Sequence, residues 1–128
     1  MIETLIYVAA GSAIGGVSRY LLGKVINEHY TSHIFLGTMV VNIIGCFAIG
    51  LFYGLANRHD LLSNNMKMFL ITGFCGSFTT FSTFTNESYI LLKNGDLTTF
   101  VTYLLISLIG GITALIIGNE AVKLFQSL

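Results

Sequence analysis

Four long stretches without a charged side chain run along the sequence, separated by short polar segments. They cover residues 4–18, 34–57, 68–86 and 97–119. An α-helix needs about 20 mostly apolar residues to cross the hydrocarbon core of a bilayer. None of the stretches alternates with the period of two that is typical of a membrane β-strand. The pattern therefore predicts four transmembrane helices, at residues 4–26, 34–57, 67–92 and 97–122.

The composition agrees with a membrane protein. Hydrophobic residues make up 54% of the 128 residues and charged residues only 9%, whereas soluble domains average about 25% charged residues. We therefore expect one all-α, multi-pass domain over residues 1–128, surrounded by the lipid bilayer. The formal net charge is zero, so nucleic acid is not indicated as a partner.

The two sides of the membrane carry nearly equal positive charge. One side would carry three Lys or Arg residues, and the other two or three, depending on whether Arg19 reaches the interface. An excess of Lys and Arg on one side normally sets the orientation of such a chain. The balance is either the scatter of a small protein or a sign that the chain inserts both ways, which would allow an antiparallel dimer. Four helices of this size enclose no pore of their own, which favours an oligomer.

The third predicted span contains the uncharged segment GFCGSFTTFSTF at residues 73–84. A continuous helix over this span would be about 39 Å long against a core of about 30 Å, so the segment lies at the midplane. Gly73 and Gly76 each weaken a helix by roughly 1 kcal/mol relative to alanine, and the Thr and Ser cluster weakens it further. A broken helix at this depth must be buried in protein or line a cavity. Its freed carbonyls suit a cation, and its hydroxyls donate to an anion or water.

Phenylalanine recurs every three residues in this segment, at Phe78, Phe81 and Phe84. A continuous helix would align the three rings on one face, and such a stripe usually contacts lipid or packs. An aromatic ring also has a positive edge. Rings presented edge-on, beside hydroxyl donors and the Asn42 amide, would dehydrate a small anion at the midplane.

Three other polar residues lie at membrane depth: Arg19, Asn42 and Glu87. Counted along their helices, all three lie roughly 8–12 Å in from the same side of the bilayer. Charged side chains there are costly unless they are paired or face water. Two interpretations remain open. One is an Arg19–Glu87 ion pair with Asn42 joining helices, and the other is a water-filled vestibule in which Arg19 attracts an anion.

Small residues predict close contacts between helices. GxxxG patterns occur at residues 11–15 and 50–54, and Ser107, Gly110 and Gly111 follow one another along the fourth span. Such residues let helix backbones approach closely in lipid. We expect these positions to be helix contacts.

No group of residues indicates an enzyme. His29, His33 and His59 fall in the predicted connections and have no carboxylate or cysteine partner at metal-site spacing. Cys46 and Cys75 lie at membrane depth in different spans. We expect them to be small packing residues rather than a disulfide or a metal pair.

Three segments carry a resemblance to a known family: GGVSRY at 15–20, GTMVVNIIG at 37–45 and GFCGSFTTFSTF at 73–84. In order and spacing they resemble the signature segments of the Fluc (CrcB) fluoride channel family, and the length and number of spans agree over the whole chain. The resemblance implies an antiparallel, dual-topology homodimer in the inner (plasma) membrane of a microbe, with a broken third helix. It implies passive export of fluoride from the cytoplasm.

The resemblance also assigns roles to residues. It places seven side chains in the anion pathway: Phe81, Phe84, Asn42, Ser82, Thr83, Thr38 and Arg19. The two phenylalanines would present their ring edges, Asn42 would be the pore asparagine, and Arg19 would lie in the aqueous vestibule. A structural sodium ion (Na+) at the dimer interface would be held by the main-chain carbonyls of Gly76 and Thr79. Glu87 follows the motif without an assigned role.

The alternative function is a small multidrug-type proton-coupled cation antiporter, which is also short, four-helical and able to insert both ways. That class needs a membrane-embedded carboxylate, typically in the first span, whereas Glu3 lies at the tip of that span. Glu87 would have to serve, with Arg19 opposing a cationic substrate. A non-transporting assembly subunit would account for the helix packing but not for the midplane hydroxyls.

Overall fold

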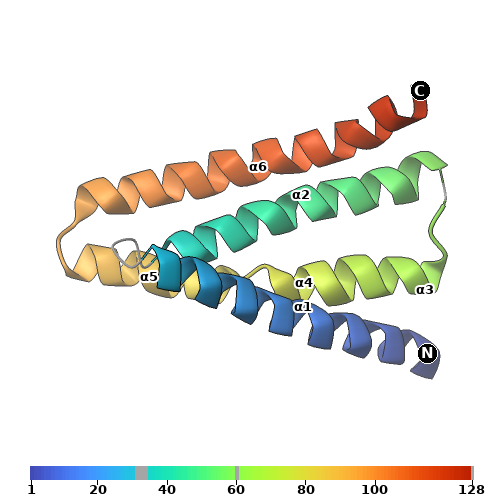
Figure 1. Ribbon diagram of the computed structural model, residues 1–128, viewed down its shortest axis with the longest axis horizontal. Helices are drawn as coiled ribbons and strands as arrows, with labels where there is room; N and C mark the ends of the chain where they lie inside the picture. The colour runs from blue at the N-terminus through green and yellow to red at the C-terminus, as the bar shows by residue number, and fades with distance from the viewer. Residues whose placement is uncertain (31–34, 60, 128) are drawn as a thin grey trace.

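The computed structural model describes residues 1–30, 35–59 and 61–127. Its helices are, in chain order, α1 (Ile2–His29), α2 (Leu36–His59), α3 (Asn64–Lys67), the π-helix η1 (Met68–Cys75), α4 (Gly76–Phe78), α5 (Phe81–Lys93) and α6 (Leu97–Ser127). They run along the long axis of the molecule (Figure 1). The start of α1 and the end of α6 lie at the same end of the molecule, as an even number of crossings requires.

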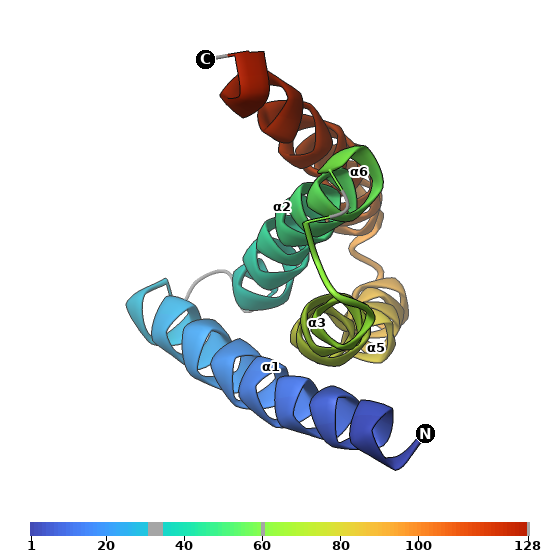
Figure 2. The ribbon, with the colours of Figure 1, turned by 90° about the vertical axis from the view of Figure 1, so that its right-hand side faces the viewer.

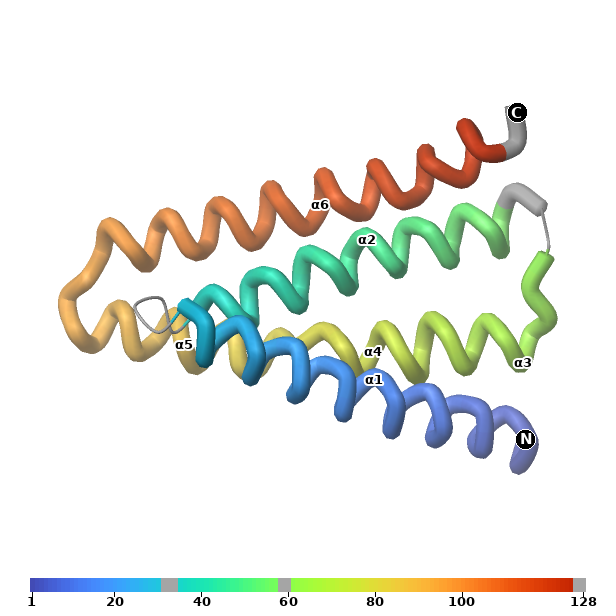
Figure 3. Tube along the Cα trace, in the orientation of Figure 1, coloured from blue at the N-terminus to red at the C-terminus, as the bar shows by residue number. Residues whose placement is uncertain are grey.

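Three helices of the described chain are long and apolar enough to cross a membrane: α1, α2 and α6. The fourth predicted span, 67–92, is not one helix, because α4 ends at Phe78 and α5 begins at Phe81. The tube in Figure 3 shows that the segments from α3 to α5 nevertheless follow one another along the same axis. His29 and His59, expected in connections, are the last residues of α1 and α2, and His33 lies outside the described residues.

The helices form two closely packed pairs. α2 packs chiefly against α6, while α1 packs against η1 and α4. Seen end-on in Figure 2, α1 and α6 lie on opposite sides of α2. A Cβ atom at Gly11 or Gly15 would collide with the main chain of η1, and one at Gly50 would collide with the main chain of Leu115 in α6. The packing role predicted for the two GxxxG patterns is confirmed.

A small apolar core lies beside the break between α4 and α5. Phe84, Leu91 and Tyr103 are buried there, between α5 and α6. Cys75 is fully buried and Cys46 is half-buried, and both are free thiols. This core fixes the position of α5 against α6 and therefore the position of the first turn after the break.

Candidate functional site

A side chain from α2 holds the interruption between α4 and α5. Thr79 and Thr80 are extended, with φ −86° and ψ 155° at Thr79 and φ −145° and ψ 117° at Thr80. Asn42 Nδ2 donates to Thr80 O at 3.1 Å, and Thr80 N donates to Asn42 Oδ1 at 2.8 Å. Thr80 is also the N-cap of α5, because its Oγ1 accepts from Thr83 N at 3.3 Å. One amide thus satisfies both main-chain groups of the residue at the break.

The break leaves carbonyl oxygens without their helical donors, among them those of Gly76 and Thr79. In a continuous α-helix, Thr80 N–H would donate to Gly76 O and Thr83 N–H would donate to Thr79 O. Here the first donates to Asn42 and the second to the side chain of Thr80. Main-chain oxygens are ligands for hard cations, so the carbonyls of Gly76 and Thr79 could serve as such ligands. No group of three or more His, Cys, Asp or Glu residues in the described ranges could hold a metal ion.

Arg19 and Glu87 bind different partners. Arg19 Nε donates to Ser77 O at 3.2 Å, another carbonyl near the break. Glu87 accepts two hydroxyl hydrogen bonds, from Thr38 Oγ1 at 2.7 Å and from Tyr103 Oη at 2.8 Å. These contacts do not match the ion pair that the sequence left open. The part of that interpretation that concerns Asn42 is confirmed, because its amide joins α2 to the break. Both Arg19 and Glu87 line one polar space.

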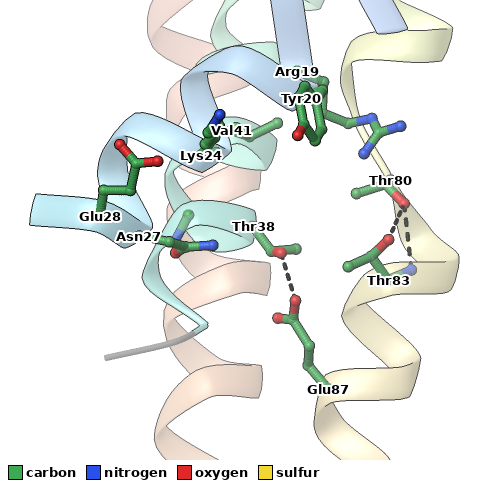
Figure 4. A pocket seen from close by; sticks show the side chains of 12 residues that line it. Arg19, Tyr20, Lys24, Asn27, Glu28, Thr38, Val41, Thr80, Thr83 and Glu87 are labelled. Atoms are coloured by element: carbon green, nitrogen blue, oxygen red, sulfur yellow. Dashed lines mark hydrogen bonds between the residues drawn. The ribbon is translucent and has the colours of Figure 1, made fainter. Parts of the chain in front are cut away.

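α1, α2 and α5 line a cavity of about 500 Å³, which we call the first cavity. Three residues predicted for the anion pathway line it, namely Arg19, Thr38 and Thr83, together with Thr80 and Glu87 (Figure 4). The remaining polar lining comes from the last turns of α1: Tyr20, Lys24, Asn27 and Glu28. Two cationic groups, four hydroxyls, an amide and two carboxylates therefore line one space.

A second cavity, of about 260 Å³, shares Thr80 with the first. Asn42, Phe81 and Phe84 line it, so the predicted amide and both predicted pore rings lie together. Ser107 of α6 also lines it, and its buried hydroxyl has no hydrogen-bond partner in the described part of the chain. Because buried polar groups nearly always have a partner, this hydroxyl is available to an ion or to water.

The expectation of a single phenylalanine stripe is wrong. Phe78 is buried and stacks on Phe74, with ring centroids 5.5 Å apart, whereas Phe81 is 76% exposed. Phe84 is buried, with its centroid 6.2 Å from Phe81 and 5.0 Å from Tyr103. The period-three argument assumed a continuous helix, but the extended residues Thr79 and Thr80 interrupt the helical register between Phe78 and Phe81.

Two predicted residues lie apart from this grouping, and one contributing residue was missed. Ser82 is on the exposed face of α5, and Gly76 is exposed, with Ile71 O 3.8 Å from where a Cβ would lie. Tyr103 of α6 was not predicted, although a buried tyrosine usually finds a hydrogen-bond partner. It is the only tyrosine of the uncharged stretch 97–119, and this was the signal that could have identified it.

The long apolar helices and the polar cavities at a helix break define a multi-pass α-helical membrane protein with polar cavities between its helices. The profile of the family described as "CrcB-like protein, Camphor Resistance (CrcB)" matches residues 6–119. The chain belongs to the CrcB family.

Bacterial relatives match the chain over nearly its whole length. One from Azobacteroides pseudotrichonymphae is 39% identical over 125 residues, which are 98% of this chain and 100% of the relative. Another, from Flavobacterium psychrophilum, is 40% identical over 92% of this chain and 98% of its own. A third, from Bacteroides fragilis, is 42% identical over 97% and 99%, respectively. Each of the three carries the name "Fluoride-specific ion channel FluC".

Proposed function

We propose that this chain forms a fluoride-selective ion channel that exports fluoride passively from the cytoplasm of a bacterium across its plasma membrane, relieving fluoride toxicity. The observation that carries the proposal is the grouping of Asn42, Phe81 and Phe84 around one cavity at the helix break. The first cavity, with Arg19, joins it at Thr80. Membership of the CrcB family and the names of the three relatives support fluoride as the ion.

The side chains supply donors in the order that a small anion needs. Arg19 in the first cavity attracts the anion while it is still hydrated. The Thr83 hydroxyl accepts from Thr80 Oγ1 at 3.1 Å, so its own hydrogen is free to donate. The Asn42 amide has two hydrogens, and only one of them is used on Thr80 O. At the break, the positive ring edges of the two phenylalanines replace the remaining water.

Passive transport agrees with the hydrogen bonds that Glu87 makes. Both of its carboxylate oxygens accept hydroxyl hydrogen bonds, from Thr38 and Tyr103. A coupling carboxylate must exchange protons with its substrate site, whereas these two bonds hold Glu87 in the wall of the first cavity. Thr38 has to turn its hydroxyl from Glu87 to the anion to join the pathway.

The exposed face of α5 supports a dimer. Phe81, Ser82, Thr85 and Asn86 are all exposed and lie on one face of the helix. Polar groups at membrane depth face protein or water rather than lipid, so a second copy is the natural cover for this face. The nearly equal charge of the two sides favours insertion in both orientations, and thus an antiparallel homodimer.

Sodium at the dimer interface is the proposed structural ion. The carbonyls of Gly76 and Thr79 would hold it, since both are released from the helical ladder and Gly76 is exposed on the molecular surface. Bound there, the ion would supply a fixed positive charge to carbonyl oxygens that have lost their N–H partners.

Fluoride release from liposomes tests the function. Purified protein is reconstituted into vesicles loaded with potassium fluoride, valinomycin starts the efflux, and a fluoride electrode records it. We expect rapid release, none with chloride, and loss of release in Phe81→Ile. Release that requires an imposed proton gradient would refute passive conduction.

A further inference from the structure

The first turn of α2 is capped from another helix. Gly37 is the second residue of α2, so its N–H belongs to the first four donors that have no partner within the helix. Such a donor is usually satisfied by a Ser, Thr, Asp or Asn just before the helix, but here Phe35 stands at that place. Instead, Asn27 Oδ1 of α1 accepts the Gly37 N–H at 3.2 Å.

The contact is close because residue 37 has no side chain. A Cβ atom there would lie 2.7 Å from Asn27 Oδ1 and 3.0 Å from Gly23 O. Both distances are tighter than ordinary contact, so a larger residue would displace the Asn27 side chain from the Gly37 N–H and press on Gly23 O. Asn27 and Gly37 therefore form one unit, which we call the α1–α2 clasp.

The clasp stands at the outer end of the first cavity. Asn27 lies eight residues after Arg19, and Glu87 seven residues after Thr80, so both lie about 10–12 Å further from the break. Both line the cavity, as does Gly37. Thr38, next to Gly37, reaches across to Glu87 at 2.7 Å. The first turn of α2 is thus held from α1 on one side and from α5 on the other.

We propose that Asn27 is a positioning residue for the anion pathway: through Gly37 it fixes the first turn of α2 and so keeps the Thr38 hydroxyl in the wall of the first cavity. The inference rests on the proposed function, because it assigns the Thr38 hydroxyl to the ion. Asn27 does not have to touch the ion. Loss of the Asn27 side chain lowers anion binding at the outer end of the pathway and leaves the positions of the Phe81 and Phe84 rings unchanged.

Fluoride efflux at several loading concentrations tests this. In Asn27→Ala we expect a rate about two- to tenfold lower at low fluoride, the order of an N-cap's contribution, a smaller deficit at saturation, and unchanged exclusion of chloride. Asn27→Asp keeps an acceptor for the Gly37 N–H and should restore slow hydrogen exchange in the first turn of α2, while its negative charge in the first cavity keeps the fluoride rate low. Gly37→Ala should reproduce the loss. Asn57→Ala, an exposed asparagine near the opposite end of α2, is the matched control and should equal the wild type.

A double variant separates positioning from general destabilisation. If Asn27 acts through Thr38, adding Asn27→Ala to Thr38→Val lowers the rate no further than Thr38→Val alone. Additive losses, or a wild-type rate in Asn27→Ala, would overturn the proposal.

Amide hydrogen exchange gives a readout that does not depend on transport. The first turn of α2 should exchange faster in Asn27→Ala than in the wild type and in Asn57→Ala, and an unchanged rate there would also overturn the proposal. If the wild type itself releases no fluoride, the proposed function fails and the pathway role of Asn27 falls with it. Faster exchange in Asn27→Ala would then still establish the clasp.

Discussion

Replacing Asn42 with alanine removes the side-chain amide that binds both the N–H and the C=O of Thr80. The hydrogen bonds lost measure 3.1 Å and 2.8 Å. A main-chain group left unpaired in the interior costs about 1–3 kcal/mol, which gives about 2–6 kcal/mol for the pair. Both residues are only half-buried and line cavities that admit water. Water recovers part of the loss, so we expect a decrease of about 2–3 kcal/mol in the free energy of unfolding.

The variant should also lose fluoride transport. Without Asn42, Thr80 N–H is free to return to Gly76 O, and each step toward a continuous helix closes the break. Unfolding in mixed detergent micelles measures the stability, and liposome efflux measures transport. Asn42→Asp, which keeps the acceptor but not the donor, should lose stability and transport to a smaller degree. Asn42→Ala with wild-type efflux and a stability within about 0.5 kcal/mol of the wild type, the range of ordinary surface substitutions, would refute this reasoning.

Three further predictions concern other contacts. Gly15→Ala should lower the unfolding free energy in micelles by about 1–3 kcal/mol, because its Cβ meets the main chain of η1. Gly16 has open space around it, so Gly16→Ala should be neutral or stabilising, and equal effects of the two substitutions would contradict the close packing. Tyr103→Phe removes the hydroxyl that donates to Glu87 and should lower the unfolding free energy by about 1–3 kcal/mol in the same assay. A change near zero would show that this hydrogen bond contributes little to stability. Arg19→Lys keeps the positive charge and should keep most of the efflux rate at low fluoride. Arg19→Gln should lower that rate about tenfold or more, as the loss of an interaction of about 1.4 kcal/mol would produce. Equal rates in the two variants would exclude attraction by charge.

The membrane architecture could be predicted because it follows from local sequence. Uncharged stretches of sufficient length predicted the three long helices, and their bounds differ from the structure by a few residues at most ends. The GxxxG patterns identified contacts correctly, since glycine is required wherever a neighbouring main chain occupies the space of a Cβ. Both features depend on composition and spacing alone.

The polar contacts at the site could not be predicted in the same way. The sequence brought Asn42, Phe81 and Phe84 to one depth, but the pairing of Asn42 with Thr80 joins residues 38 positions apart. The choice of partners for Arg19 and Glu87 likewise depends on how the helices are rotated. The periodicity gave a wrong prediction at Phe78, because it assumes one continuous helix across Thr79 and Thr80. A side chain of α2 holds the second of these residues extended.

The chain contains no proline, and the break in its third span therefore has no covalent cause. The partner that holds Thr80 extended arrives from α2, so until the two segments meet, residues 64–93 have an uninterrupted helix open to them. Such a helix leaves no main-chain group stranded in hydrocarbon, where each would cost several kcal/mol. The segment can thus enter the bilayer as an ordinary span and be remodelled only when it associates with α2. A chain whose third span has inserted without meeting α2 would then lack the break, and with it the cavity lined by Asn42, Phe81 and Phe84.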